Sequence, residues 1–273
     1  MPSLSTIPAP RRVFIVPYRD RDRDRRALLH SLNQMLEGQG DWEVFFIHQC
    51  DSRPFNRGAM KNIGFLLMRK KYPKHYRAIT FVFHDVDTRP RYRGQFPYET
   101  SAGMVAHYHG THYSLGGVFA IKGADFERTG GFPNFWGWGL EDNLMYDRCL
   151  KAGLRVDRRN FYPLRHPEVI RSFDGYKRVT SKREAAVYKY GEADDMRGIR
   201  DIRACPGEDG MIDVTGFVVS TDHRDPSFTS LDIRAGSRLS ADRRLLQDSG
   251  SGPPVRKRIK RLPPGVIRRW PPR

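Results

Sequence analysis

Apolar residues form short continuous runs that alternate with helical patterns over the first 84 residues. Strands are predicted at 12–16 (RVFIV), 42–48 (WEVFFIH) and 78–83. Between them, apolar residues recur at helical spacing, at Leu28, Leu29, Leu32, Met35 and Leu36 and then at Met60, Ile63, Leu67 and Met68. Three strand–helix steps with apolar strands favour an α/β fold with a parallel sheet covered on both faces.

The pattern is less regular after Asp87. Residues 88–112 are rich in Tyr, Gly and His without a clear period, and we expect an irregular segment there. The later elements expected are strands at 115–121, 154–156, 199–202 and 211–219, a short helix at 124–129, and a helix that follows the tryptophan-rich loop and runs to about 152. Gly153 ends that helix, because glycine is common just after a helix C-terminus.

The charge is concentrated towards the C-terminus. The 273 residues carry a formal net charge of +17, and from Thr221 onwards 13 Lys and Arg face 5 Asp and Glu among seven prolines. We therefore expect an N-terminal extension at 1–10, one domain at 11–219, and a disordered basic, Pro-rich tail at 220–273. Such a tail predicts an anionic partner, either an anionic surface or nucleic acid.

The cysteines and the apolar runs argue against a disulfide-rich protein, a cysteine-rich zinc protein and a membrane-spanning protein. Cys50, Cys149 and Cys205 are too widely spaced for a disulfide framework or a cysteine-rich zinc motif. No apolar run is long enough to span a bilayer, and the N-terminus lacks the apolar region of a secretory signal. The sequence predicts a soluble protein without a transmembrane segment.

Candidate binding residues follow the predicted strands. The loops Tyr18–Arg21, Cys50–Arg57 and Asp85–Asp87 all come at the carboxyl ends of strands, where open α/β sheets bind ligands. The first two place an aromatic residue beside arginine, which suits stacking on a base and pairing with phosphate. The alternative is that these are ordinary surface arginines.

Residues Asp85–Asp87 form an Asp-x-Asp sequence at a strand end. Alternation along an extended segment would put both carboxylates on one side. Carboxylate oxygens suit Mn²⁺ or Mg²⁺, which bridge to a diphosphate; the alternative is a solvated turn. Among the histidines, His166 is the best-placed second ligand, although His84, His107, His109 and His112 compete with it.

The stretch at 134–150, NFWGWGLEDNLMYDRCL, combines an aromatic loop with two acids. Trp136 and Trp138 offer flat faces, and Glu141 and Asp142 start a helix, where its dipole favours negative charge. A sugar-binding site needs a ring face on which the sugar can stack and a carboxylate that can act as a base towards a hydroxyl. The alternative is a capped helix after a hydrophobic loop.

The motifs FNRGAMKNIGF, FHDVD, LGGVFAI and FPNFWGWGLED, in this order and spacing, resemble those of the β-1,4-galactosyltransferases and their N-acetylgalactosaminyl relatives. PYRDR resembles their nucleotide motif, and the similarity covers about 11–219. The resemblance implies a nucleotide-sugar glycosyltransferase fold of the GT-A type, with a Rossmann-like N-terminal half and a mixed central sheet. It implies transfer of galactose from UDP-galactose to a sugar or glycoconjugate, inversion at the anomeric carbon, and Mn²⁺ as cofactor with Mg²⁺ as the alternative.

By position, the resemblance also assigns roles. Asp142 is the expected catalytic base, and Asp87 and His166 are the expected metal ligands. Trp138 is expected on a flexible lid. The expected acceptor-binding residues are Trp138, Gly139, Glu141 and Asn143. The expected donor-binding residues are Pro17, Tyr18, Arg19, Arg21, Phe55, Arg57, Asp85, Val86, Ser114 and Gly117.

The sequence departs from the family at several positions. Asn143 replaces a third acid, which bears on the acceptor, and Leu140 stands where many members have glycine. Pro163 and Leu164 occupy the places of a further metal ligand. Ser114 replaces a tyrosine that crowds the donor sugar, so UDP-GalNAc stays open as donor.

The catalytic status and the location of the protein each have an alternative. A weakened scaffold that binds carbohydrate or nucleic acid is the non-catalytic alternative to a transferase. Without an anchor, we expect a cytoplasmic bacterial or viral enzyme, and a Golgi-lumen location only if an anchor was removed.

Overall fold

A computed structural model describes residues 9–173, 175, 177–190, 193–221, 223–224 and 228–232. Residues 1–8 of the expected N-terminal extension and residues 233–273 of the expected tail lie outside these described residues. Among the described residues, no helix is long and apolar enough to cross a membrane.

A mixed sheet of nine strands forms the centre of the molecule, in the order β11-β12-β2-β1-β3-β6-β5-β7, with β8 also paired to β5. Neighbours β12, β2, β1 and β3 run parallel, whereas β6 is antiparallel to both β3 and β5. The strands are β1 Arg12–Tyr18, β2 Trp42–Gln49, β3 Thr80–His84, β5 Met104–Gly110, β6 Val118–Lys122, β7 Arg155–Asp157, β8 Tyr162–Pro163, β11 Arg200–Pro206 and β12 Met211–Val218. The mixed central sheet expected for the fold is therefore confirmed.

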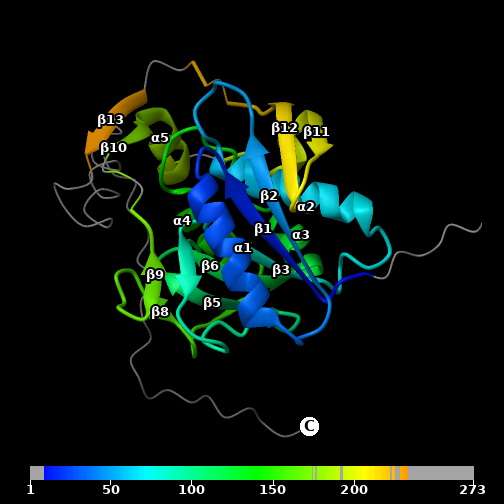
Figure 1. Ribbon diagram of the computed structural model, residues 1–273. Helices are drawn as coiled ribbons and strands as arrows, with labels where there is room; N and C mark the ends of the chain where they lie inside the picture. The colour runs from blue at the N-terminus through cyan, green and yellow to red at the C-terminus, as the bar shows by residue number, and fades with distance from the viewer. Residues whose placement is uncertain are drawn as a thin grey trace, which may run out of the picture.

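Helices cover both faces of this sheet (Figure 1). Helix α1 (Asp22–Leu36) packs on one face, against Phe14 and Val16 of β1. Helices α2 (Arg57–Lys71), α3 (Gly123–Thr129) and α4 (Glu141–Lys151) pack on the other, against Val13 and Ile15. Each large apolar side chain so buried contributes about 1.5–3 kcal/mol, and the continuous apolar runs of β1–β3 supply such side chains to both faces.

The expectation of an irregular segment at 88–112 was wrong. This segment contains β4 (Thr88–Pro90) and β5, a strand of the main sheet. The apolar pattern did not reveal β5 because two of its buried side chains are histidines. Carbonyl groups satisfy one ring nitrogen of each: the His107 Nε2 contacts the oxygens of His109 and Gly116 at 3.0 and 3.1 Å, and the His109 Nδ1 contacts the oxygen of Tyr162 at 2.9 Å.

A few residues of the expected tail are described, and they form a strand. Residues Phe228–Asp232 form β13, which pairs antiparallel with β10 (Lys177–Ser181). A second ribbon pairs β4 with β9 (Val169–Arg171). Strand pairing requires only backbone groups, so the polar composition of these segments concealed it. The remaining elements are α5 (Lys182–Tyr190) and the short η1 (Met196–Gly198).

Candidate active site

The three loops predicted from the strand ends lie together at the carboxyl edge of the sheet. The Arg19 guanidinium, after β1, donates to the carbonyl oxygens of Gln49, the last residue of β2, and of Asp51 and Arg53, which follow it. Arg57, at the start of α2, donates to Asp85 after β3 at 2.6 Å. The convergence expected from the strand order is confirmed.

Arg57 contacts three carboxylates. Besides Asp85, its Nη1 lies 2.9 Å from the Glu141 Oε1 and 3.8 Å from the Asp142 Oδ2. Burial works against the charged guanidinium, but Asp85, Asp142 and Glu141 together outweigh it and hold the pKa of Arg57 above its ordinary value. The guanidinium is therefore permanently charged, and it links α2, β3 and α4 at one point.

Asp142, the expected base, is fully buried at the N-terminus of α4. Its Oδ1 accepts from the Lys61 Nζ at 2.9 Å, and Lys61 is itself 1% exposed. A Cβ built on Gly116 would lie 2.5 Å from the Asp142 Oδ2, so only glycine leaves room for this carboxylate. The sequence analysis missed Lys61. Its signal was a lysine four residues after Arg57, within an apolar stretch of the helix.

A small polar pocket adjoins these charges. Gly117, at φ +73°, contributes its carbonyl oxygen to the Asp85 N–H at 2.9 Å, and the pocket opens beside this turn. Its lining residues are Asp85, Thr88, His109, Gly110, Thr111, Ser114, Gly116, Gly117, Leu164 and Arg171. The expected donor residues Asp85, Ser114 and Gly117 therefore meet in one pocket.

The expectation that Asp85 and Asp87 act from one side of an extended segment was wrong. Residues 85–87 form a turn, in which the Thr88 N–H donates to the Asp85 oxygen at 3.3 Å, so strand alternation does not apply. Asp85 contacts Arg57, whereas the Asp87 Oδ2 lies 3.5 Å from the Arg171 Nε. Val86, between them, packs partly buried on the α1 side of the sheet.

His109 has the geometry of a metal ligand, although the sequence analysis ranked it below His166. Its Nδ1 donates to the Tyr162 carbonyl, so Nε2 carries the lone pair, and this buried Nε2 has no hydrogen-bond partner in the described chain. Burial lowers the pKa of His109 to about 4, which keeps the ring neutral. Second-sphere hydrogen bonds of this kind orient metal-binding histidines.

His166 lies beside the same tyrosine. Its ring packs edge-on against the Tyr162 ring with centroids 4.9 Å apart, and its Nδ1 accepts from the Glu168 N–H at 3.3 Å. The donor types of Asp87, His109 and His166 fit a divalent cation. They do not form a compact three-atom cluster among the described residues, so binding would require side-chain movement, including release of Asp87 from Arg171.

The other competing histidines are engaged elsewhere. His84 is fully buried and contacts its neighbouring Asp85 carbonyl oxygen at 2.9 Å. His107 contacts carbonyl oxygens, and His112 packs on Phe161 at 4.5 Å between ring centroids.

The tryptophan loop is held by a buried carboxylate from α5. The Glu184 side chain accepts from the Trp136 N–H at 2.6 Å and from the Gly137 N–H at 2.7 Å. Trp136 is a core residue, stacked on Phe217 at 5.5 Å. Trp138 is more exposed; its N–H donates to the Val179 oxygen at 2.6 Å. The lid role of Trp138 stays a prediction.

The residues that flank the acids have defined places. Gly139 and Leu140 both have positive φ, +95° and +70°, which explains why glycine is common at the position of Leu140. The Asn143 amide donates to the Tyr113 oxygen at 3.3 Å, and the Asn143 residue is buried, so it holds the segment that leads to Ser114. Ser114 itself is buried, with its hydroxyl 2.7 Å from that of Thr111.

The remaining expected donor residues lie at the carboxyl end of β1 and in the loops that follow β1 and β2. Pro17 and Tyr18 end β1, and the Tyr18 ring meets the His48 ring edge-on at 5.1 Å. The Phe55 ring lies 5.4 Å from the Arg19 guanidinium. Arg21 pairs with Asp24 at 2.6 Å. Their roles in donor binding stay predictions.

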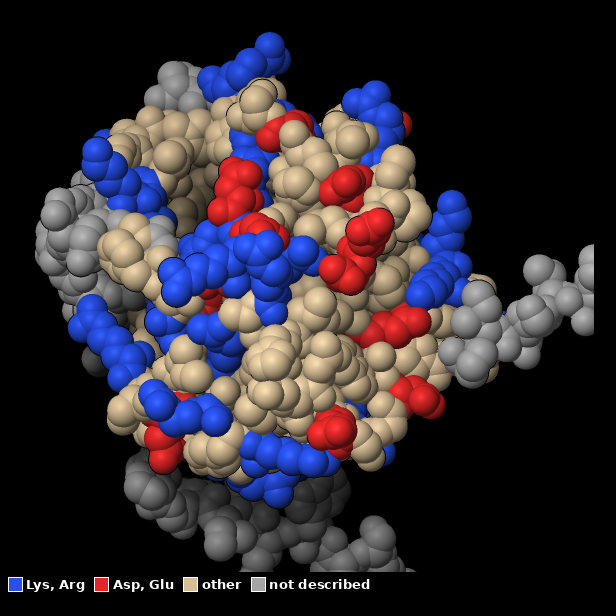
Figure 2. All heavy atoms as spheres, viewed as in Figure 1, with Lys and Arg blue, Asp and Glu red and all other residues tan. Residues whose placement is uncertain are grey.

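Basic side chains gather across the middle of the face that carries α1, with acidic side chains beside them (Figure 2). Part of this charge is compensated within α1, where Asp22 pairs with Arg25 and Arg26. These ion pairs reduce the number of basic side chains on this face that lack an acidic neighbour.

Comparisons with known proteins point to one family. A model of the N-terminal region of glycosyl transferase group 7 matches residues 5–94, and a model described as the N-terminal domain of galactosyltransferase matches 92–171. Mouse β-1,4-galactosyltransferase 2 is 30% identical over 245 residues, which are 85% of this chain and 62% of the relative. Bovine β-1,4-galactosyltransferase 1 is 34% identical over 54% of this chain and 38% of its own length.

A solved structure has a similar fold. It is a Drosophila β-1,4-galactosyltransferase 7 variant in complex with manganese, UDP-Gal and xylobiose. The TM-score is 0.62 at 18% identity, covering 78% of this chain and 96% of that one. The likeness shows that the fold is that of a GT-A glycosyltransferase.

Replacing Lys61 tests the buried ion pair. Lys61→Met keeps an unbranched side chain, one atom shorter, but removes the ammonium that compensates Asp142, so we expect unfolding free energy to fall by about 3–5 kcal/mol in urea titrations. The double variant Lys61→Met/Asp142→Asn removes both charges and should recover most of the loss. A Lys61→Met single variant as stable as the parent would contradict the pairing.

Glu184 predicts a pH dependence of stability. Burial is the main cause that raises its pKa from 4.5 to about 7. The folded state thus binds the Glu184 proton more tightly than the unfolded state does. The stability that this proton contributes is fully present below pH 4.5, the ordinary pKa of the group, and is lost as pH rises through about 7. Thermal unfolding between about pH 5 and about pH 8 should show this decline, and Glu184→Gln should reduce it.

The matched control is Glu208→Gln, at an exposed glutamate. It should leave the pH profile of the midpoint unchanged. An identical slope in the parent and in Glu184→Gln would show that the loop carboxylate does not titrate in this range.

Proposed function

The chain belongs to glycosyl transferase group 7, and from this membership and the site we propose that it transfers galactose from UDP-galactose to a hydroxyl of a sugar or glycoconjugate. The chain spans 62% of the length of its mouse relative. The observation that carries the proposal is the buried carboxylate of Asp142, fixed at a helix N-terminus beside a polar pocket at the carboxyl edge of the sheet.

The proposed chemistry is a single displacement with inversion. The acceptor oxygen attacks C1 of galactose, the bond from C1 to the diphosphate oxygen breaks, and UDP leaves. The Asp142 carboxylate accepts the proton from the attacking hydroxyl, as a general base does. Lys61 and Arg57 compensate the charge of this buried carboxylate, and Gly116 leaves room for it.

Other residues position the substrates in this proposal. Glu141, held by Arg57, faces the acceptor side, and Trp138 contributes a ring for the sugar. Tyr18, Arg19 and Phe55 bind the uridine side of the donor. The tryptophan loop, tied to Glu184, limits the access of water and so limits hydrolysis of the donor.

A divalent cation, Mn²⁺ or alternatively Mg²⁺, would supply a positive charge that offsets the charge developing on the leaving diphosphate. Asp87 and His166 would hold it. We add His109 as the third ligand, because its Nε2 is buried without a hydrogen-bond partner in the described chain, its ring is oriented by Tyr162, and the residue lines the same pocket as Asp85. His109 would replace the ligand that Pro163 and Leu164 cannot supply.

Galactose is favoured over N-acetylgalactosamine as the donor sugar because the curated relatives are named galactosyltransferases. Ser114 is small, but its hydroxyl is already paired with Thr111 and its side chain is buried. A competition assay between UDP-galactose and UDP-GalNAc decides between the two donors.

The activity is tested by UDP release with UDP-galactose and a panel of sugar acceptors. We expect acceptor-dependent release in the parent and a loss of about 10²–10⁴-fold in kcat for Asp142→Asn, the range of a general base. Asp147→Asn, the same change further along α4, is the matched control and should retain activity. Activity unchanged in Asp142→Asn, or absent with every acceptor, would overturn the proposal and leave a binding scaffold as the alternative.

The third ligand is tested by direct metal binding without substrates. Electron paramagnetic resonance of free Mn²⁺ should show binding at least about tenfold weaker in His109→Gln than in the parent, because a ligand is lost. His107→Gln is the matched control, since His107 is buried on the same strand but bonded to carbonyl groups. Equal Mn²⁺ affinity in His109→Gln and the parent would remove His109 from the ligand set.

A further inference from the structure

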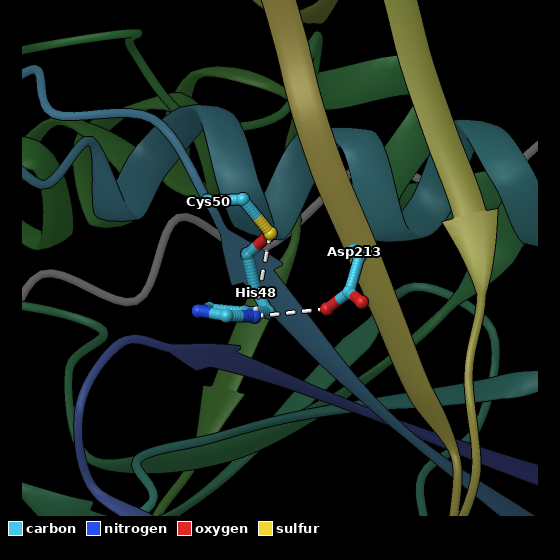
Figure 3. Close-up of side chains that lie close together, drawn as sticks. All are labelled: His48, Cys50 and Asp213. Carbon is cyan, nitrogen blue, oxygen red and sulfur yellow. Dashed lines mark hydrogen bonds and ion pairs between the residues drawn. The ribbon is translucent and has the colours of Figure 1, made fainter.

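A second group of potential ligands lies outside the candidate active site. His48, Cys50 and Asp213 present one atom each within 4.8 Å of one another, the only such group of three found among the described residues. The His48 Nδ1 is 2.8 Å from the Asp213 Oδ1 and 3.4 Å from the Cys50 Sγ (Figure 3). Asp213 is 165 residues from His48 in sequence.

Sheet register brings these residues together. His48 of β2 is paired directly with Asp213 of the parallel strand β12, so both side chains lie on the same face. Cys50 is two residues after His48 and therefore lies on that face too. Its N–H donates to the Val214 oxygen at 3.0 Å, which continues the pairing to β12 beyond the end of β2. The placement thus follows from backbone pairing as well as from the rotamers of the side chains.

The geometry does not suit a catalytic relay. In a Cys–His–Asp relay the thiol and the carboxylate engage opposite ring nitrogens, whereas here both meet Nδ1. The Nδ1 of a neutral imidazole carries at most one hydrogen, so it cannot donate fully to both the thiol and the carboxylate. A nitrogen, a sulfur and an oxygen atom that lie within 4.8 Å of one another are instead placed as ligands of one ion could be.

The two separations from His48 Nδ1 are close to those of tetrahedral coordination, and Cys50 Sγ lies within 4.8 Å of the Asp213 carboxylate. Zn²⁺ lies about 2.0 Å from nitrogen and oxygen ligands and about 2.3 Å from sulfur, which places ligands about 3.3 Å (N to O) and about 3.5 Å (N to S) apart. The observed separations of 2.8 and 3.4 Å need only small adjustments. A nitrogen, a sulfur and an oxygen ligand together suit Zn²⁺ better than Mg²⁺ or Ca²⁺, which prefer oxygen alone.

The site is open to solvent. The His48 side chain is 28% exposed and the Asp213 side chain 45% exposed, so an ion can enter without unfolding. Burial, followed by Asp213 and Asp51, raises the pKa of the Cys50 thiol to about 11, with Arg19 opposing them, so a bound ion would have to displace the thiol proton. Three protein ligands and solvent access leave a fourth position for water.

We propose that His48 Nδ1, Cys50 Sγ and Asp213 Oδ1 bind Zn²⁺, with water as the fourth ligand, and that the ion ties β12 to β2. Binding to the folded chain alone stabilises it by mass action. The late strands β11 and β12 are therefore held to the N-terminal half of the sheet by coordination as well as by backbone hydrogen bonds.

The test uses the full chain, freed of metal and titrated with Co²⁺ and then Zn²⁺. A thiolate-to-Co²⁺ charge-transfer band should appear and be abolished by stoichiometric Zn²⁺. This band reports the cluster alone, because none of the residues assigned to the candidate active site is a cysteine. Zn²⁺ should also raise the midpoint of thermal unfolding of the parent.

Cys50→Ser should lose the band, and His48→Gln and Asp213→Ala should weaken Zn²⁺ binding at least about tenfold. The matched control is Cys205→Ser: Cys205 is also exposed and is paired with Asp213 one strand further out, but it is outside the group. Circular dichroism confirms that each variant is folded.

Two results would overturn the proposal. The first is a parent that gives no band and no Zn²⁺-dependent rise in midpoint, which would make the group a hydrogen-bonded cluster only. The second is a loss in Cys205→Ser equal to that in Cys50→Ser, which would show that the sulfur ligand has been wrongly assigned.

Discussion

The compensation of buried charge beside α2 constrains the rest of the site. Arg57 and Lys61 are one helical turn apart, and together they face carboxylates from the end of β3 and the start of α4. An ionised group buried without its partner costs several kcal/mol, so α2, α4 and the end of β3 are stable only in one relative arrangement. Gly58 permits it, because a Cβ there would lie 2.0 Å from the Pro133 oxygen.

The loops around this centre are fixed by segments far away in the sequence. Glu184 binds the backbone of Trp136 and Gly137, and the Trp136 Nε1 donates to the Thr221 oxygen. Arg148 donates to the carbonyl oxygens of Gly131, Ala193 and Asp194. Most of the aromatic loop is thus held in place before any ligand binds, and its more exposed end is held through the Trp138 N–H, which donates to the Val179 oxygen.

The sequence predicted the elements β1 to β3 with α1 and α2 because their apolar residues form continuous or periodic runs. It did not predict β5, since buried histidines bonded to carbonyls break that pattern. Asp142 could be identified from its motif, but Lys61 could not, because a lysine on a helix is usually solvated and only the tertiary structure shows that it is buried. The turn at Asp85–Asp87 likewise depends on backbone contacts that alternation does not encode.

The position of Asp213 shows how hydrophobic burial can place a polar residue. Its neighbours Ile212 and Val214 are buried on the α2 face of the sheet, where they join the larger core. A shift of β12 by one residue would move Ile212 and Val214 out of the core and would place the Asp213 side chain inside it. The burial of two apolar side chains therefore fixes the register, and the register places Asp213 opposite His48. Because Tyr18 is paired with His48 on the next strand, the same constraint aligns the zinc group with the end of β1, and hence with the edge of the sheet on which the donor loops lie.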